Sequence, residues 1–417
     1  MVMGKGYMDR YLAADEVQEI VSQAAASLPL DGKRVLVIIP DGTRTMPMPL
    51  MFSLFKKFIE PRVKALDYLV ALGTHPPMSD AQLTRLVGQT VVNGQAGRSR
   101  IFNHEWSNPS SLHLLGAIPA REIRQITNGL MDQDVPVRLN KLILDYDQLI
   151  ICGPVFPHEA AGFSGGNKYF FPGIAGPDII NFIHWLGAVV TNYKIVGSLH
   201  APTRAIIDRA AAFVNRPVAC FALVVMEAGL SGLYFGTPRE AWEAAVPLSA
   251  AKYIIYVDKP FKQIWSVMPE MYDDLWTGAK GMLKVETAAA DGGEVIIYAP
   301  HITEISYTHG KLIDELGYHC RDYFLADWEK YKGYPGAVVS HSTLINGLGT
   351  YDAATGVETH RVRVTLATGI PEERCRRLNI GYLDPRTVDL RNYQGREDQG
   401  ILVVPHAGEM LYRVKPG

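Results

Sequence analysis

The sequence is poor in cysteine and offers nothing from which a disulfide framework could be built. Its 417 residues include four cysteines, which lie far apart and form no CxxC pair: Cys152, Cys220, Cys320 and Cys375. Widely spaced single cysteines argue against a structural zinc knuckle and are typical of a reducing compartment. We therefore expect ordinary core thiols and a cytoplasmic protein.

Two further absences narrow the possible partners. No apolar run approaches the ~20 residues that span a bilayer, and the first residues lack the apolar core of a signal peptide. Lys and Arg together number 41, and Asp and Glu number 43, so the formal net charge is −2. A chain with so small a net charge has no overall positive electrostatic potential to attract nucleic acid or an anionic membrane. We expect neither partner.

Common cofactor and metal motifs are missing too. The sequence has no GxxxxGK[ST] loop, and no GxGxxG follows the first expected strand. It also has no HxxxH or HxH pair to support a zinc site with several protein ligands. These absences speak against a simple metal hydrolase. If a metal binds, most of its donors must come from something other than the protein.

Length and periodicity predict an α/β fold with two domains. A chain of 417 residues exceeds one ordinary core. In the first part, short apolar runs alternate with helix-length segments, which favours a doubly wound, mostly parallel sheet. We place this cofactor-binding domain at residues 1–252, and a smaller α/β domain, expected to close over the active site, at residues 253–417. The strands expected in the first domain are 34–39, 66–72, 148–151 and 218–226.

The second domain has expected strands of its own, and three helices stand out in the first. Helix 79–87 starts with the capping-box pair Ser79 and Gln82, and helix 179–190 follows Pro177. A third helix is expected at 49–58. Residues 258–286 show no clear strand, so we expect them to span the domain boundary. The strands expected in the second domain are 253–257, 294–298, 337–339, 361–366 and 400–404.

Polar side chains follow three of the strands expected in the first domain. Asp41 and Arg44 come after strand 34–39, His75 after 66–72, and His158 after 148–151. Ligands of open parallel sheets bind beyond the carboxyl ends of the strands, so we expect these side chains to converge. Each also has a purely structural explanation: Asp41-Gly42 as a turn, His75 in a rigid solvated loop, and His158 with Glu159 as a surface pair.

The segment 158–178, HEAAGFSGGNKYFFPGIAGPD, places a lysine among glycines and aromatic residues. Gly165 and Gly166 would let the backbone approach a ligand and expose N–H groups to an anion. The helix that begins at Pro177 favours an anion at its N-terminus as well. Lys168 would then hold a phosphate as a point charge or serve as a nucleophile. Alternatively, its stem covers aromatic surface.

His184 lies in the helix after this segment, between Ile183 and Trp185. A single histidine in such a helix is commonly a core residue. A neutral imidazole in apolar surroundings also suits a soft metal. The residues alone leave both interpretations open.

Taken together, these motifs resemble the lactate racemase family in order and spacing. The resemblance rests on Asp41-Gly-Thr-Arg44, on His75, on the HxxxGxxGGxK segment from His158 to Lys168, and on His184. It covers the first domain up to this helix and reaches the second domain mainly at Lys280. That family uses a nickel-pincer nucleotide, a nickel pyridinium-3,5-bisthiocarboxylic acid mononucleotide.

The resemblance implies how the cofactor is held. Lys168 would carry the nucleotide covalently through a thioamide, beside Gly165 and Gly166, and His184 would be the one protein ligand to nickel. The sulfur arms and ring carbon of the pincer would supply the other donors. Proteins that synthesise the cofactor are then implied as partners.

The resemblance also implies a reaction, the racemisation or epimerisation of a 2-hydroxy acid. Hydride would pass from the substrate to the nickel-pincer nucleotide and back through a transient 2-keto acid. His75 and His158 would be the two acid/base groups, Asp41 and Arg44 would orient cofactor and substrate, and Lys280 would bind the substrate carboxylate. Two bases are needed because each enantiomer presents its hydroxyl proton differently.

One departure bears on the substrate. Before Lys280 the chain reads Trp276-Thr277-Gly278-Ala279, where lactate racemase itself has a tyrosine and a glutamine. We therefore expect a 2-hydroxy acid that need not be lactate and can be larger. Two alternatives stay open: an oxidoreductase or isomerase that uses a nicotinamide or a sugar phosphate, and a non-catalytic carrier of the nickel nucleotide.

Overall fold

The computed structural model describes residues 2–226 and 229–415, and the chain divides into two compact units. Unit 1 contains Met1–Phe156, Phe163–Ile180 and Arg204–Lys252. Unit 2 contains Pro157–Gly162, Asn181–Thr203 and Tyr253–Gly417. The sequence predicted a single cut between residues 252 and 253. The units are instead interleaved, because unit 2 takes in two earlier segments, which contain His158 and His184.

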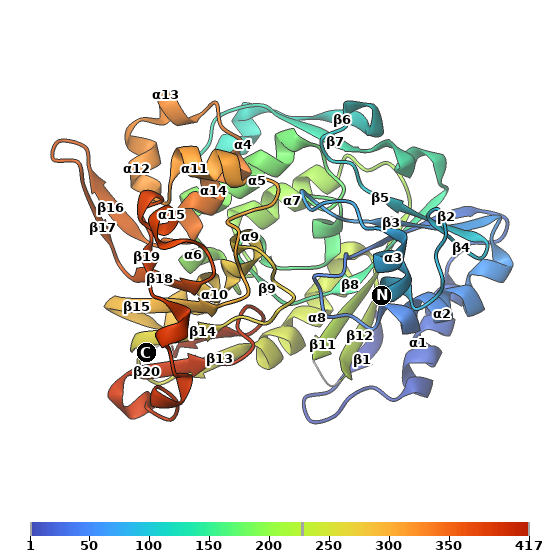
Figure 1. The fold of residues 1–417 in the computed structure, drawn as a ribbon. Helices are drawn as coiled ribbons and strands as arrows, with labels where there is room; N and C mark the ends of the chain where they lie inside the picture. The colour runs from blue at the N-terminus through green and yellow to red at the C-terminus, as the bar shows by residue number, and fades with distance from the viewer. Residues whose placement is uncertain (1, 227–228, 416–417) are drawn as a thin grey trace. The chain divides into compact units, whose positions relative to one another are not determined.

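Unit 1 is built on an eight-stranded sheet, and the predicted α/β class is confirmed (Figure 1). Its five central strands are parallel, and the outer pairs at both edges are antiparallel. The order is β1 (Met3–Gly6), β12 (Gly229–Gly236), β11 (Val218–Met226), β8 (Gln148–Pro154), β2 (Arg34–Ile39), β3 (Ala65–Val70), β5 (Ser99–Asn103) and β4 (Gln95–Ala96).

The chain order of this sheet reverses between β2 and β8. Strands β3 and β5 extend the sheet on one side of β2, and β11 extends it on the far side of β8. In doubly wound sheets, such a reversal opens a crevice at the carboxyl ends of the two strands, where ligands bind. The segments that begin at Pro40 and Val155 leave from this point.

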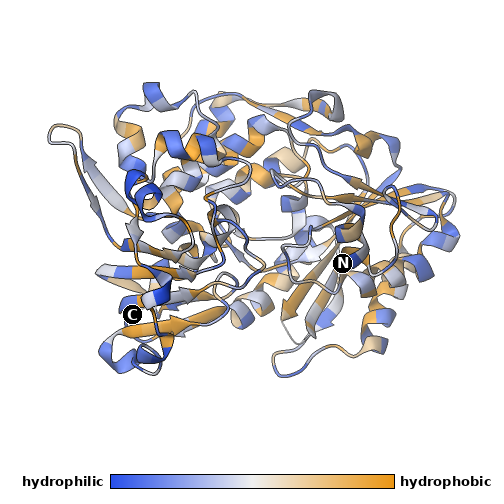
Figure 2. Cartoon of the chain, in the orientation of Figure 1, coloured by the Kyte–Doolittle hydropathy of each residue, from blue (hydrophilic) through white to orange (hydrophobic). Residues whose placement is uncertain are grey.

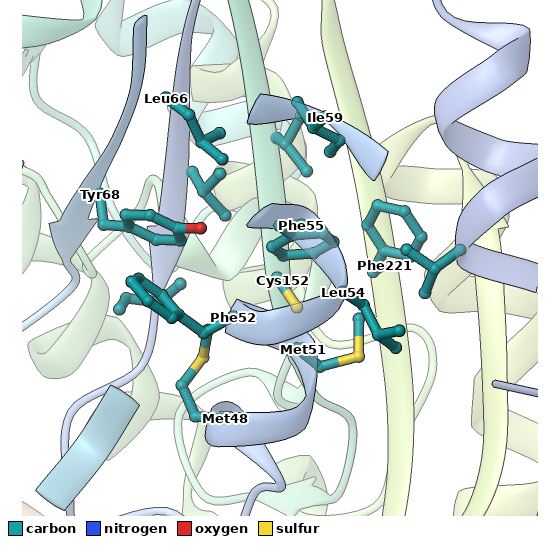
Figure 3. Packing of buried hydrophobic residues seen from close by; sticks show 14 of the residues in the cluster. Met48, Met51, Phe52, Leu54, Phe55, Ile59, Leu66, Tyr68, Cys152 and Phe221 are labelled. Carbon is teal, nitrogen blue, oxygen red and sulfur yellow. The ribbon is translucent and has the colours of Figure 1, made fainter. Parts of the chain in front are cut away.

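Helix α2 (Met48–Phe58) shows how the core of unit 1 forms. Its apolar side chains Phe52 and Phe55 pack against Tyr68 and Phe221 of the sheet, with ring centroids 4.8 and 5.2 Å apart (Figure 3). Strands β8 and β11 run almost wholly hydrophobic (Figure 2). This is the pattern of strands that are buried on both faces.

The other helices of unit 1 follow the predicted alternation. Helix α3 (Asp80–Val87) starts at the predicted capping box, in which Ser79 and Gln82 bond reciprocally. A hairpin of β6 (Leu112–Ile118) and β7 (Val135–Asn140) lies outside the main sheet. The remaining α-helices are α1 (Ala14–Ser27), α4 (Ala120–Ile126), α7 (Pro202–Ala211) and α8 (Pro238–Tyr253).

Unit 2 has a five-stranded sheet in which every pair is parallel. The order is β19 (Gly381–Tyr382), β18 (Arg363–Thr368), β15 (Ala289–Ala299), β14 (Phe261–Val267) and β20 (Ile401–Val404). Smaller pairs are β13 (Ile254–Val257) with β21 (Leu411–Val414), β16 (Gly349–Asp352) with β17 (Val357–His360), and β9 (Pro157–His158) with β10 (Gly162–Phe163).

The helices around this sheet are mostly short. Helix α5 (Pro177–Val190) starts at Pro177 as predicted and crosses from unit 1 into unit 2. The others are α6 (Asn192–Ile195), α9 (Leu275–Gly278), α10 (Lys280–Leu283), α11 (Gly310–Leu316), α12 (Arg321–Ala326), α13 (Trp328–Tyr331), α14 (Gly336–Leu344) and α15 (Glu372–Arg377). In the described parts of the chain, no helix combines the length and apolar character needed to cross a bilayer.

Two of the expected elements were wrong. Residues 337–339 belong to helix α14, not to a strand, and residues 258–286 contain strand β14, an interior strand of the second sheet. All of residues 337–343 are buried, so the helix has no solvent-facing side. Its sequence therefore lacks the alternation of apolar and polar residues that indicates a helix. In β14, Lys262 and Gln263 interrupt the apolar run that would have marked a buried strand.

Candidate active site

A buried aspartate and a histidine form a hydrogen-bonded pair at the carboxyl ends of β2 and β3 in unit 1. His75 Nδ1 lies 2.5 Å from Asp41 Oδ2. Burial would raise the pKa of Asp41, but the bond and charge of His75, with the nearby Arg44 and Thr43, hold it well below its usual range. Asp41 is therefore an anion that orients His75 through Nδ1, and Nε2 is left to exchange a proton.

Thr43 links this pair to Arg44. The Asp41 Oδ1 atom accepts hydrogen bonds from the Thr43 backbone N–H at 3.0 Å and from its hydroxyl at 2.6 Å. Arg44 Nη1 in turn donates to Thr43 Oγ1 at 2.8 Å. The structure thus brings together three of the residues selected from the sequence, and it adds Thr43.

Lys168 lies in a 3-10 turn, Gly166–Tyr169, and its side chain is half-buried. The loop before it is held by two residues that the sequence did not single out. Arg204 donates through Nη1 and Nη2 to the Gly165 carbonyl at 3.3 and 3.2 Å, and its guanidinium lies 3.8 Å from the ring centroid of Trp242. Trp242 Nε1 donates to the Ser164 carbonyl at 2.8 Å.

Packing gives the two glycines of this loop a structural role. Gly165 has a φ of +85°, and a Cβ there would lie 2.6 Å from Val155 Cγ2. Gly166 has a φ of +57°, and a Cβ would lie 2.9 Å from the Pro238 carbonyl oxygen. Larger residues would push the loop away from β8 and α8, so both glycines set the position of Lys168.

A pair of backbone bonds connects the Lys168 segment to the His75 loop. The Gly173 N–H donates to the Lys168 carbonyl at 3.3 Å, and the Gly73 N–H donates to the Gly173 carbonyl at 2.9 Å. The predicted base His75 and the predicted cofactor lysine therefore belong to one connected part of unit 1.

In unit 2, His158 is buried beside Glu159. The structural alternative of a surface pair does not hold, because only 6% of His158 is exposed. Its Nδ1 accepts the Ala160 N–H at 3.1 Å, which places the ring proton on Nε2, 3.5 Å from Glu159 Oε1. In the first pair the carboxylate bonds to the fixed nitrogen, whereas here Glu159 lies beside the other ring nitrogen.

Two lysines one helical turn apart complete this cluster. Lys280 Nζ lies 4.6 Å from the ring centroid of Tyr272, and the buried Lys284 donates to the Pro157 carbonyl. Burial would raise the pKa of Glu159, but the positive charges of His158, Lys284 and Lys280 hold it well below its usual range. Sequence reasoning missed Glu159 as a partner of these lysines. The i, i+4 spacing was a usable signal for Lys284.

His184 is half-buried on α5. Its neighbour Trp185 stacks on Trp328, with ring centroids 4.6 Å apart and planes inclined by 1°. Gly187, one turn further on, is close enough that a Cβ would lie 3.8 Å from Ala160 Cα. His184 therefore lies on the side of α5 that faces the His158 segment. That it shares a cavity with Lys168 stays a prediction.

No group of three or more His, Cys, Asp or Glu side chains suited to a metal occurs within residues 2–226 and 229–415. The four cysteines are free and buried. His184 therefore belongs to no such group among the described residues.

These features define a class: an α/β protein of two units, with a histidine–carboxylate pair in each and a lysine on a glycine-rich loop. Residues 16–195 match the lactate racemase N-terminal domain. Over these residues the chain is similar to the lactate racemase family.

Two relatives are named lactate racemase. The protein of Thermoanaerobacterium thermosaccharolyticum is 25% identical over 287 residues, which cover 64% of this chain and 60% of the relative. The protein of Lactiplantibacillus plantarum is 28% identical over 172 residues, or 40% of this chain and 34% of the relative. The matched region thus spans less than two thirds of either relative.

Two solved structures are similar over nearly the whole chain. A crystal structure of a Thermotoga maritima protein has a TM-score of 0.90 at 31% identity, and the match covers 98% of this chain and all of that one. The lactate racemase apoprotein of T. thermosaccharolyticum has a TM-score of 0.72 at 19% identity, covering 95% and 92%. The second match shows a shared fold.

Proposed function

We propose that this protein is an isomerase, a racemase or epimerase of a 2-hydroxy acid that depends on a nickel-pincer nucleotide. One observation supports it above all: His75 and His158 each have one ring nitrogen fixed by a hydrogen bond and a carboxylate close by. Inverting a hydroxyl-bearing carbon requires an acid/base group for each enantiomer. Histidine suits the task because its ordinary pKa lies near neutrality.

The residues present fit such a cofactor. A single imidazole, His184, suits a metal whose other donors come from an organic ligand. Lys168 offers an amine for a covalent bond, and Arg44 offers a charge for a phosphate. The bound nucleotide would supply a hydride acceptor, which the reaction needs because the α-hydrogen of a 2-hydroxy acid is hardly acidic.

The chain's own residues then have separate tasks. His75 takes the hydroxyl proton of one enantiomer at Nε2, and Asp41 stabilises the imidazolium that results. His158 is the acid/base group for the other enantiomer, with Glu159 beside its Nε2. Lys280 holds the substrate carboxylate, and its charge contributes to the lowered pKa of Glu159.

The proposal is tested by producing the full chain together with the cofactor's biosynthetic proteins. We expect an adduct on Lys168 by peptide mass mapping and about one nickel per chain by metal analysis. Lys168→Ala should lose the adduct, whereas Lys194→Ala, at an exposed lysine of α6, should keep it. His184→Ala should keep the adduct and lose nickel.

Activity is then measured by circular dichroism with a panel of chiral 2-hydroxy acids. Racemisation of at least one acid by the loaded protein supports the proposal. An adduct with nickel but no racemisation would favour the carrier. A chain with neither adduct nor nickel, yet active with a nicotinamide or a sugar phosphate, would favour the oxidoreductase or isomerase alternative.

A further inference from the structure

Trp276 lies one helical turn before Lys280 in unit 2. Residues 275–283 form a nearly continuous helical segment, in which Ala279 N bonds to the Leu275 carbonyl and Leu283 N to the Ala279 carbonyl. Residues four apart on such a segment lie on the same side. Both side chains are partly exposed. The indole is therefore a neighbour of the amine that we assign to the substrate carboxylate.

Two buried histidines fix the indole in place. His341 of α14 stacks on Trp276, with ring centroids 4.5 Å apart and planes inclined by 13°. His309, just before α11, packs at the same distance at 43°. Only 8% of each histidine is exposed, so they lie behind the indole. A Trp needed only for packing would be buried as its partners are. This one keeps part of its surface accessible.

The imidazole stacked on the indole is uncharged, and a carboxylate lies nearby. Burial lowers the pKa of His341 to about 4, so its ring is neutral at pH 7. Asp274, two residues before Trp276, accepts bonds from Thr277 and from the Tyr307 N–H. A second carboxylate on a substrate would meet the neutral His341 stack and the Asp274 carboxylate, which disfavours dicarboxylic acids.

We propose that Trp276, backed by His341 and His309, is the specificity-determining surface beside Lys280, and that it selects 2-hydroxy acids whose side chain is uncharged and larger than methyl. This inference rests on the proposed function. A flat indole offers dispersion contact to an aryl ring or to the C–H face of a polyhydroxyl chain. Aryl and polyhydroxyl side chains are both uncharged, and the experiment below distinguishes between these two classes of substrate.

The test uses four acids with the full-length chain: lactate, 3-phenyllactate, gluconate and malate. Affinities are measured by calorimetry on cofactor-free protein, and kcat/KM on protein loaded with cofactor. In the wild-type protein, we expect the affinity and the kcat/KM for 3-phenyllactate or gluconate to be about tenfold or more above those for lactate and malate. Trp276→Ala should remove most of this difference, because the larger acid should bind more weakly while the values for lactate stay nearly unchanged.

Three further variants separate specificity from folding. Trp276→Phe keeps an aromatic face, so it should retain more of the difference than alanine and serves if Trp276→Ala fails to fold. His341→Phe keeps an uncharged ring in the stack, so it should preserve the preference. Trp328→Phe is the matched control, because it alters the ring that stacks on Trp185. It should leave the preference among the four acids unchanged.

The outcomes distinguish the two proposals. A Trp276→Ala protein with the wild-type preference, or a wild type that prefers malate, overturns the inference and leaves the racemase intact. A loaded wild type that turns over none of the acids defeats the proposed function. The calorimetric preference and its loss in Trp276→Ala would still decide whether this surface selects uncharged acids.

Discussion

At the level of single residues, the Asp41–His75 bond joins a buried carboxylate to one of the predicted bases. Asp41 combines burial with an ionised carboxylate, a costly state that its three partners offset. The lower pKa of Asp41 means that this contribution to stability is present above about pH 4, the usual aspartate pKa. It is lost only as the pH falls further, through the lowered folded-state pKa.

Asp41→Asn should therefore impair turnover more than folding near neutral pH. The amide keeps the shape but cannot stabilise an imidazolium or enforce the same tautomer, so we expect a fall of roughly 100-fold or more in rate. Racemisation followed from both enantiomers of one acid measures it, with the Lys168 adduct quantified by mass. Thr43→Ser, which keeps the hydroxyl bond to Asp41, is the control. An unchanged rate in Asp41→Asn would remove His75 as a base oriented by this aspartate.

Single residues also show where sequence reasoning reaches its limit. Asp41 and His75 could be placed together because both follow buried strands, and neighbouring parallel strands end at one edge. Glu159 and Lys284 could not be placed together from the sequence, because their proximity depends on how the short β9 segment packs against α10. Local spacing in the sequence does not reveal burial of that kind, and a surface pair of His158 and Glu159 therefore stayed open as an alternative.

The glycine-rich loop is the element on which the cofactor proposal depends, and a buried arginine holds it. The Arg204 guanidinium bonds to the Gly165 carbonyl and lies on Trp242, and burial lowers its pKa to about 10. Arg204→Lys puts a compact, strongly hydrated ammonium in that place. We expect a loss of about 1–3 kcal/mol in unfolding free energy and less complete loading of Lys168.

A second arginine of α7 provides the comparison. Arg209 makes a partly exposed ion pair with Glu122, and such pairs contribute little to stability. Arg209→Lys should change the unfolding free energy by about 1 kcal/mol or less and leave loading intact. Urea unfolding and intact mass measure both variants. Equal effects of the two substitutions would mean that Arg204 has no special role in positioning the loop.

Among the elements, those with a clear period were predicted well. Strands Arg34–Ile39 and Val218–Met226 have the predicted bounds, and α3 begins at its predicted cap. Helix α14 was misread because burial on all sides leaves a short apolar run without a period. Strand β14 was missed for the opposite reason, since polar residues interrupt a strand that lies in the interior of its sheet.

For the whole molecule, the electrostatics predict loss of stability in mild acid. Each unit contains a buried histidine whose pKa burial lowers to about 4: His104 in unit 1 and His341 in unit 2. His104 Nε2 bonds to the Ala175 carbonyl, and Nδ1 bonds to the Asn140 amide nitrogen. These two bonds suit the neutral ring, in which one nitrogen donates and the other accepts. Between pH 6.5 and 4, the unfolded chain binds protons at these positions that the folded chain does not.

Stability should therefore fall as the pH is lowered through this window, by up to about 3 kcal/mol per histidine. The carboxylates Asp41 and Glu159 act in the same direction but only below their ordinary pKa values near 4, so their loss follows at lower pH. Urea unfolding at pH 7.5, 5.5 and 4.5 measures the slope. His341→Phe, which cannot titrate, should flatten it, whereas His200→Gln, at an exposed histidine, should not. A slope that His341→Phe leaves unchanged would mean that folding does not lower the pKa of His341. The stack on Trp276 would then become charged in mild acid, and the argument against dicarboxylic substrates would lose its basis there.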